Sequence, residues 1–292
     1  MMTRSLRSAT VVVGTAAALI WITPLDLSGQ QKDSLQARLA LPPLPTYQAE
    51  APPAPPPIRA RYIFPGISVS SPTALGAEGG TVYLGVGYQE RTRYWTDDDG
   101  AVVAGIGVGD AREKVGLEVN ATSYSTVRRG FFDRVGFGAQ LHRYVNEETA
   151  LAFGAENLFM INGDKSDVGR SYYAVITQLF ALKADPVEPF SLITASLGVG
   201  NGRFRTEKDV FADRSTVGVF GALSVHVIRP VAAIADWTGQ DLALGLSVAP
   251  FERFPLVITP AFMDVTRNAG DGARFVIAAG VGRRLTAGPI QF

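Results

Sequence analysis

The chain has 292 residues, 47% of them hydrophobic, and its 27 acidic residues balance 27 basic ones, so the formal net charge is zero. This balance provides no global field that would attract nucleic acid, and we expect no nucleic-acid partner. The absence of cysteine excludes disulfides, thiolate metal sites and a catalytic thiol. Because there are only two histidines, a histidine-rich metal site is excluded too, and we expect no cofactor and no metal.

The N-terminus has the pattern of an export signal. Arg4 and Arg7 precede an uninterrupted run of apolar and small residues at 9–22. This run is too short for a transmembrane helix, which needs about 20 residues, and has the length of the apolar region of a signal peptide. We therefore expect residues 1–29 to be a signal peptide, with an uncleaved anchor as the alternative.

Residues 30–61 form a proline-rich linker in this interpretation. Prolines such as Pro42, Pro43 and Pro55 remove backbone donors and fix φ, which prevents helix and sheet. Such a stretch is extended and semi-rigid, and a spacer is favoured over a segment that binds a specific partner. Residues 62–78 are expected to be a lead-in segment or a plug, with 62–69 as the part that would fill a lumen.

From residue 81 onward, apolar residues alternate with small or polar ones, which is the period of a β-strand. Each run has roughly the 9–11 residues that a tilted strand needs to cross a membrane. The predicted strands are residues 81–89, 101–109, 113–123, 133–144, 149–157, 170–182, 190–200, 215–228, 231–237, 241–250, 255–263 and 273–284.

This alternation fits a soluble sandwich as well as a membrane barrel, and the connections distinguish the two. Long polar connections alternate with short ones, as in outer-membrane barrels, with one short exception at 238–240. The apolar faces carry large aliphatic residues, whereas the opposite faces carry small residues and few charges, which suits a confined lumen. The sequence therefore predicts an all-β fold, a closed antiparallel transmembrane β-barrel of about twelve strands.

The barrel is expected to span residues 79–285 and to be followed by a C-terminal tail at 286–292. An even number of strands places both chain ends on the periplasmic side of the outer membrane. The chain thereby resembles the outer-membrane, porin-like β-barrel superfamily. It also has stretches similar to uncharacterised cyanobacterial barrel-like proteins, namely SPTALG at 71–76, LGVGNGRFR at 197–205, ADWTGQD at 235–241 and NAGDGAR at 268–274.

The resemblance implies insertion by the outer-membrane machinery and contact with membrane lipid. Members of the superfamily usually end in a strand of the type aromatic-x-aromatic, which that machinery reads. Here the last strand ends at Leu285, and Phe292 follows the turn at Gly288 and Pro289 instead.

Because side chains alternate between the two faces of a strand, the positions between the apolar residues are expected to face the lumen. The polar candidates are Glu118, Arg134, His142, Glu156, His226, Asp236, Asp241 and Arg274. They form either a charged pathway that selects solutes or a set of salt bridges that fills a narrow barrel. Asp236 and Asp241 flank the short outer turn and are the best candidates for a site at the mouth.

A strip of inward glycines is expected on the first, second and last strands, which closure makes neighbours. Its members are Gly85, Gly87, Gly105, Gly107, Gly109, Gly280 and Gly282. Glycines in such positions allow tight curvature or leave room for something to pack against them.

The function expected from these features is a narrow porin-like channel or a binding barrel for small solutes. One alternative is a structural barrel with a filled lumen that anchors periplasmic partners. A second alternative is a lipid hydrolase of the outer membrane, for which His142 or His226 would be the base. Both histidines fall at predicted periplasmic strand ends and no GxSxG motif is present, so we expect no enzymatic activity and no catalytic residue.

Overall fold

The structure is a computed structural model that describes residues 63–93, 95–127, 134–162, 169–267, 269 and 272–285. The chain divides into a unit at 1–53, which lies outside the described residues, and a second unit that contains the whole barrel. The expected signal peptide, proline-rich linker and C-terminal tail all lie outside the described residues.

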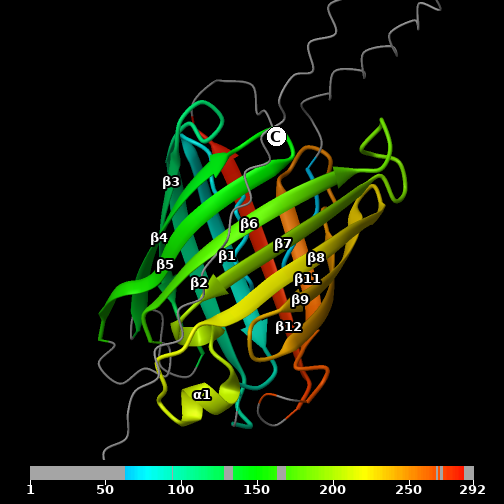
Figure 1. Ribbon diagram of the computed structural model, residues 1–292. Coiled ribbons are helices and arrows are strands. Elements are labelled where there is room, and N and C mark those ends of the chain that lie inside the picture. Colours follow the sequence, from blue (N-terminus) through cyan, green and yellow to red (C-terminus); the bar gives the residue numbers. More distant parts are fainter. Residues whose placement is uncertain are drawn as a thin grey trace, which may run out of the picture. The chain divides into compact units, whose positions relative to one another are not determined.

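Twelve antiparallel strands close into a barrel, because β1 pairs with β2 on one side and with β12 on the other. Figure 1 shows the strands crossing the barrel at a common tilt. The strands are β1 (Thr81–Gln89), β2 (Asp99–Gly109), β3 (Gly116–Ser123), β4 (Val135–Tyr144), β5 (Thr149–Ile161), β6 (Ser171–Ala181), β7 (Leu192–Gly200), β8 (Gly218–Ile228), β9 (Val231–Trp237), β10 (Leu242–Val248), β11 (Leu256–Met263) and β12 (Arg274–Arg284). The predicted all-β, closed antiparallel barrel is confirmed, and every predicted run overlaps one of these strands, although β2 begins two residues earlier and β5 ends four residues later than predicted.

Two short helices interrupt the connection between β7 and β8. They are a 3-10 turn at Gly202–Phe204 (η1) and the helix α1 at Glu207–Phe211. We call the end of the barrel that holds α1 the long-loop end, and the opposite end, where β8 turns into β9, the short-turn end (Figure 1). Among the residues that the structure describes, no helix is long and apolar enough to cross a membrane.

The connections differ in one respect from the expected alternation. The connection between β6 and β7, at residues 182–191, lies at the short-turn end but is as long as the connection at 90–98 on the opposite end. The turn between β9 and β10 is short, as predicted, and the η1 turn packs onto it, because Gln240 donates to the backbone carbonyl of Arg203 over 2.8 Å.

The distribution of side chains is the reverse of that in a soluble protein. Every strand from β1 to β11 exposes at least one large apolar side chain; examples about half exposed are Leu84, Leu141, Leu197, Leu223, Leu244 and Phe262. The inward faces of the same strands bury polar residues instead, including Gln140, Thr177, Ser196, Asp236 and Ser247. Water would favour the opposite arrangement, since soluble proteins rarely expose a continuous apolar belt.

Candidate functional site inside the barrel

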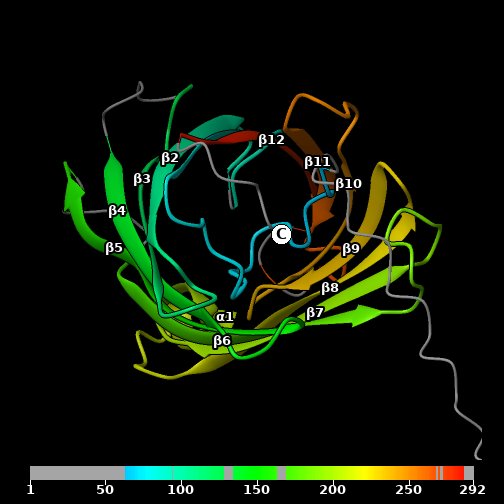
Figure 2. The same cartoon turned by 90° about the horizontal axis from the view of Figure 1, so that it is seen from above.

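Residues 63–79, which we call the luminal segment, run inside the ring of strands (Figure 2). The segment begins beside His226 near the short-turn end, where the ring of Phe64 lies 6.1 Å from the imidazole. Its Gly66 N–H donates to Ser247 Oγ over 2.7 Å, and Thr259 donates to the same oxygen over 2.9 Å. The first part of the segment is therefore attached to β10 and, through Ser247, to β11.

Asp236 holds the middle of the luminal segment. Three consecutive backbone N–H groups, those of Val69, Ser70 and Ser71, donate to its Oδ2 over 2.7, 2.7 and 3.0 Å, and the Ser71 hydroxyl donates to Oδ1. The side chain of Asp236 is fully buried. A carboxylate that accepts several backbone N–H groups forms strong, charge-assisted hydrogen bonds, so Asp236 is the principal anchor of the segment.

The segment then returns toward the short-turn end along the opposite wall. Ala74 is fully buried in an apolar cluster that contains Val175, Phe204 and Phe220. Its N–H donates to Thr177 Oγ1 over 2.8 Å. The luminal segment is thus packed on apolar side chains as well as hydrogen bonded.

Glu118 holds the last part of the segment. It accepts the backbone N–H of Ala77 over 2.7 Å and the hydroxyl of Tyr83. Gly107 lies directly against the carbonyl of Ala77, so that a side chain there would collide with the backbone. Glycine at this position permits the close approach of segment and wall.

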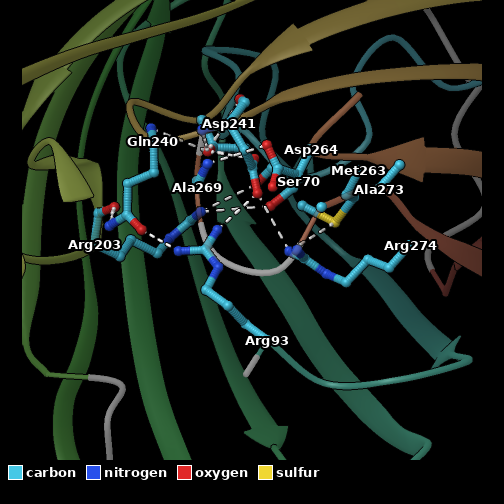
Figure 3. A network of polar contacts seen from close by, with 12 residues as sticks. Ser70, Arg93, Arg203, Gln240, Asp241, Met263, Asp264, Ala269, Ala273 and Arg274 are labelled. Carbon is cyan, nitrogen blue, oxygen red and sulfur yellow. Dashed lines mark hydrogen bonds and ion pairs between the residues drawn. The ribbon is translucent and has the colours of Figure 1, made fainter. Parts of the chain in front are cut away.

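A second polar network lies at the long-loop end and is drawn in Figure 3. Asp241, fully buried, pairs with Arg93 over 2.7 Å and with Arg274 over 3.2 Å. The Thr238 hydroxyl donates to its other oxygen over 2.7 Å, and Arg93 also donates to Gln240. This network joins β12, the turn between β9 and β10, and the connection after β1.

Arg203 connects this network to the luminal segment. Its guanidinium binds Glu156 through two hydrogen bonds of 2.5 and 2.8 Å and donates to the carbonyl of Ser70 over 3.0 Å. The η1 turn that carries Arg203 therefore contacts the wall, the turn between β9 and β10, and the luminal segment.

Both histidines are buried at the short-turn half of the lumen. His226 lies 3.0 Å from Ser191 Oγ and 3.0 Å from the carbonyl of Arg229. His142 packs against Gly76 and Gly116, and its ring nitrogens have no hydrogen-bond partner among the described residues.

The predicted site residues thus fall into several groups. Asp236, Glu118 and, through Arg203, Glu156 hold the luminal segment, whereas Asp241 and Arg274 belong to the network at the long-loop end. Arg134 precedes β4, and its carbonyl accepts the N–H of Tyr124. The glycines fall into three groups. Gly105, Gly107 and Gly109 lie against other atoms, and Gly85 lies against the Val103 side chain. Gly87 and Gly280 line open space, and Gly282 has only ordinary contacts.

Two partners of this site, Arg93 and Arg203, were not predicted. Both lie in connections between strands, where the period that assigned inward and outward faces no longer applies. The residues around them in the sequence carried no signal of an inward orientation.

Comparisons with known proteins add little to this geometry. No family model matches the chain, and no curated protein matches it. Among solved structures, the crystal structure of Neisserial surface protein A (NspA) matches with 12% sequence identity and a TM-score of 0.22, over 72% of this chain and 100% of that chain. A TM-score this low supports no inference about function, which has to come from the barrel itself.

Proposed function

We propose that this chain is an outer-membrane β-barrel for small solutes whose lumen is restricted at rest by its own luminal segment. The observation that carries the location is the inverted distribution of side chains, with apolar residues outward and hydrogen-bonded polar residues inward. In lipid every backbone polar group has to be paired within the protein, and a closed sheet meets that requirement.

The orientation follows from the connections and the start of the barrel. Long loops face the outside of the cell in barrels of this kind, and tight turns face the periplasm. We infer that α1 lies outside and that the short-turn end faces the periplasm. Residues 30–61 would then reach the barrel from the periplasmic side, as an exported N-terminus requires.

Restriction of the lumen is supported by the contacts of residues 63–79. They bind β10, β9, β6 and β3 in turn, so the segment passes from one wall of the barrel to the other. Free diffusion through the barrel would require this segment to move. Movement requires the loss of the hydrogen bonds to Asp236, the carboxylate that accepts the most donors from the segment.

The same contacts favour a second candidate, a structural barrel with a permanently filled lumen that anchors the proline-rich arm. A permanently filled lumen would bury apolar residues of the segment against the wall, as Ala74 is buried among Phe204, Phe220 and Val175. A hydrolase is less well supported, because Ser191 is almost fully buried and its hydroxyl donates to the carbonyl of Pro186 over 2.7 Å. A buried hydroxyl of this kind is out of reach of a lipid ester.

Conductance in planar bilayers tests the proposal. The wild type should conduct weakly, and Asp236→Asn should raise conductance several-fold. The substitution removes the negative charge that strengthens the three backbone N–H hydrogen bonds to Oδ2, and its amide nitrogen cannot accept the Ser71 hydroxyl at the position of Oδ1. Asp213→Asn is the matched control, because it removes an exposed carboxylate at the long-loop end.

The control should conduct like the wild type. If Asp236→Asn conducts no more than the wild type although the barrel is folded, the lumen is permanently filled and the structural candidate replaces the solute barrel. A wild type with a large, steady conductance would contradict restriction by the luminal segment.

A further inference from the structure

The luminal segment leaves one side of the lumen open. A cavity of about 350 Å³ lies against the inner faces of β11, β12, β1, β2 and β3. Among the described residues, those that line this cavity include none from the luminal segment, and the hydrogen bonds that hold the segment go to β10, β9, β6 and β3. The space is therefore part of the lumen that the segment does not fill.

The chemistry of this cavity differs from that of the rest of the interior. Each residue that lines it is Gly, Ala, Val or Thr, among them Gly87, Val103, Thr122, Val257, Ala278 and Gly280. In contrast, charged side chains hold the network around Asp241 and, through Asp236 and Glu118, the middle and last parts of the luminal segment. A charged solute placed in the cavity would lose hydration without gaining a partner, so the lining selects against charge.

Two glycines, Gly87 and Gly280, keep the cavity open although no neighbouring atom requires a glycine there. A side chain at Gly105 would strike the ring of Tyr83, and this contact explains the glycine there. A side chain at Gly87 would meet nothing within 4 Å, and one at Gly280 would meet only the Leu84 carbonyl at 3.7 Å. Glycine within a strand is unfavourable relative to alanine, so its use where nothing requires close contact preserves empty volume.

We propose that this cavity is a binding site for a neutral, mainly apolar molecule. An apolar cavity of roughly 150 Å³ accommodates benzene, so the larger volume here suits a molecule of on the order of a dozen non-hydrogen atoms. The hydroxyl of Thr122 can orient one polar group of that ligand. The site extends the proposed solute barrel by naming the class of solute, but it depends on the wall of the barrel and not on movement of the luminal segment.

Photolabelling with an uncharged diazirine-bearing decane tests the site in the full-length protein, reconstituted in phosphatidylcholine vesicles. Label should appear on inward residues such as Ala101, Val103 and Ala278, in addition to the outward residues that lipid-dissolved probe reaches. Unlabelled naphthalene should compete for the inward positions, and glucose should not. Outward labelling provides the internal standard for every variant.

Gly87→Leu should reduce inward labelling by roughly fivefold or more, because the new side chain occupies the cavity. Gly282→Leu is the matched control, since Gly282 is an inward glycine of β12 that does not line the cavity, and labelling should persist. Migration of unheated and heated samples on a gel reports whether each barrel is folded. If Gly87→Leu does not fold, Ala278→Leu fills the same space and replaces it.

Absence of inward label in the wild type, or inward label that Gly87→Leu and Ala278→Leu leave unchanged in folded barrels, would overturn the inference. Neither result would bear on the proposed function. Restriction of the lumen is tested separately, by the conductance of the wild type and of Asp236→Asn.

Discussion

Asp241 shows how one buried carboxylate fixes residues from three parts of the chain. Its side chain is fully buried, and it binds Arg274, whose side chain is 5% exposed, together with Arg93, whose side chain is 27% exposed. Removal of one member of a buried ion pair leaves the other charges without compensation. The network at the long-loop end therefore depends on Asp241 more than on either arginine alone.

We predict that Asp241→Asn lowers the free energy of unfolding by about 3 kcal/mol, measured by urea unfolding in lipid vesicles. Arg274→Met combined with Asp241→Asn should recover part of this loss, because the uncompensated guanidinium is removed as well. Glu188→Gln is the control, since Glu188 pairs with Lys183 at the surface, and its effect should stay below about 0.5 kcal/mol. Additive effects of the two substitutions would contradict the network.

At this scale the sequence identified the residues but not their partners. Asp236 and Asp241 were predicted from strand parity and from the short turn between them. If these two carboxylates lined an open pathway, their neutralisation would lower the conductance. The hydrogen bonds of Asp236 to Val69, Ser70 and Ser71 reverse that expectation. The contact with Val69 joins residues separated by 167 positions, which no local pattern encodes.

At the scale of elements, the strands were predictable and α1 was not. Alternation over a long run determines a strand, since successive side chains face opposite sides of the sheet. The helix α1 has only five residues, too few for a helical period to appear. It starts at Thr206, whose side chain accepts the N–H of Asp209 and donates to its carboxylate over 2.8 Å. This reciprocal capping at the helix N-terminus was overlooked in the sequence.

The cap predicts an acid dependence of α1. The hydroxyl of Thr206 and, next, that of Thr216 lower the pKa of Asp209 below its ordinary value of 3.8. The stabilisation of α1 by the ionised Asp209 is therefore complete above pH 3.8 and is lost only as the pH falls through the lowered pKa. NMR titration of the Asp209 side-chain carboxyl carbon should show the lowered pKa, and Thr206→Val should return the pKa toward 3.8. A titration of the wild type at or above the ordinary value would contradict the cap.

At the scale of the whole molecule, closure of the sheet follows from the sequence, whereas the state of the lumen does not. Twelve alternating runs and an apolar exterior leave few arrangements other than a closed barrel. The interior depends on where residues 63–79 lie, and that stretch has neither the strand period nor a helical one. It was proposed as a lead-in or a plug, and only its contacts with β10, β9, β6 and β3 describe how it crosses the lumen.

Disulfide trapping tests the position of the luminal segment most directly, because the natural chain has no cysteine. A β-carbon built at Gly66 lies 3.7 Å from that of Ser247, within the range of roughly 3.5–4.5 Å that a disulfide requires. Gly66→Cys with Ser247→Cys should therefore form a disulfide in membranes, and neither cysteine should then react with maleimide. Gly66→Cys with Leu246→Cys, whose second side chain faces outward, should keep both thiols. Equal labelling of the two pairs in folded barrels would contradict the position of the luminal segment against the inner face of β10.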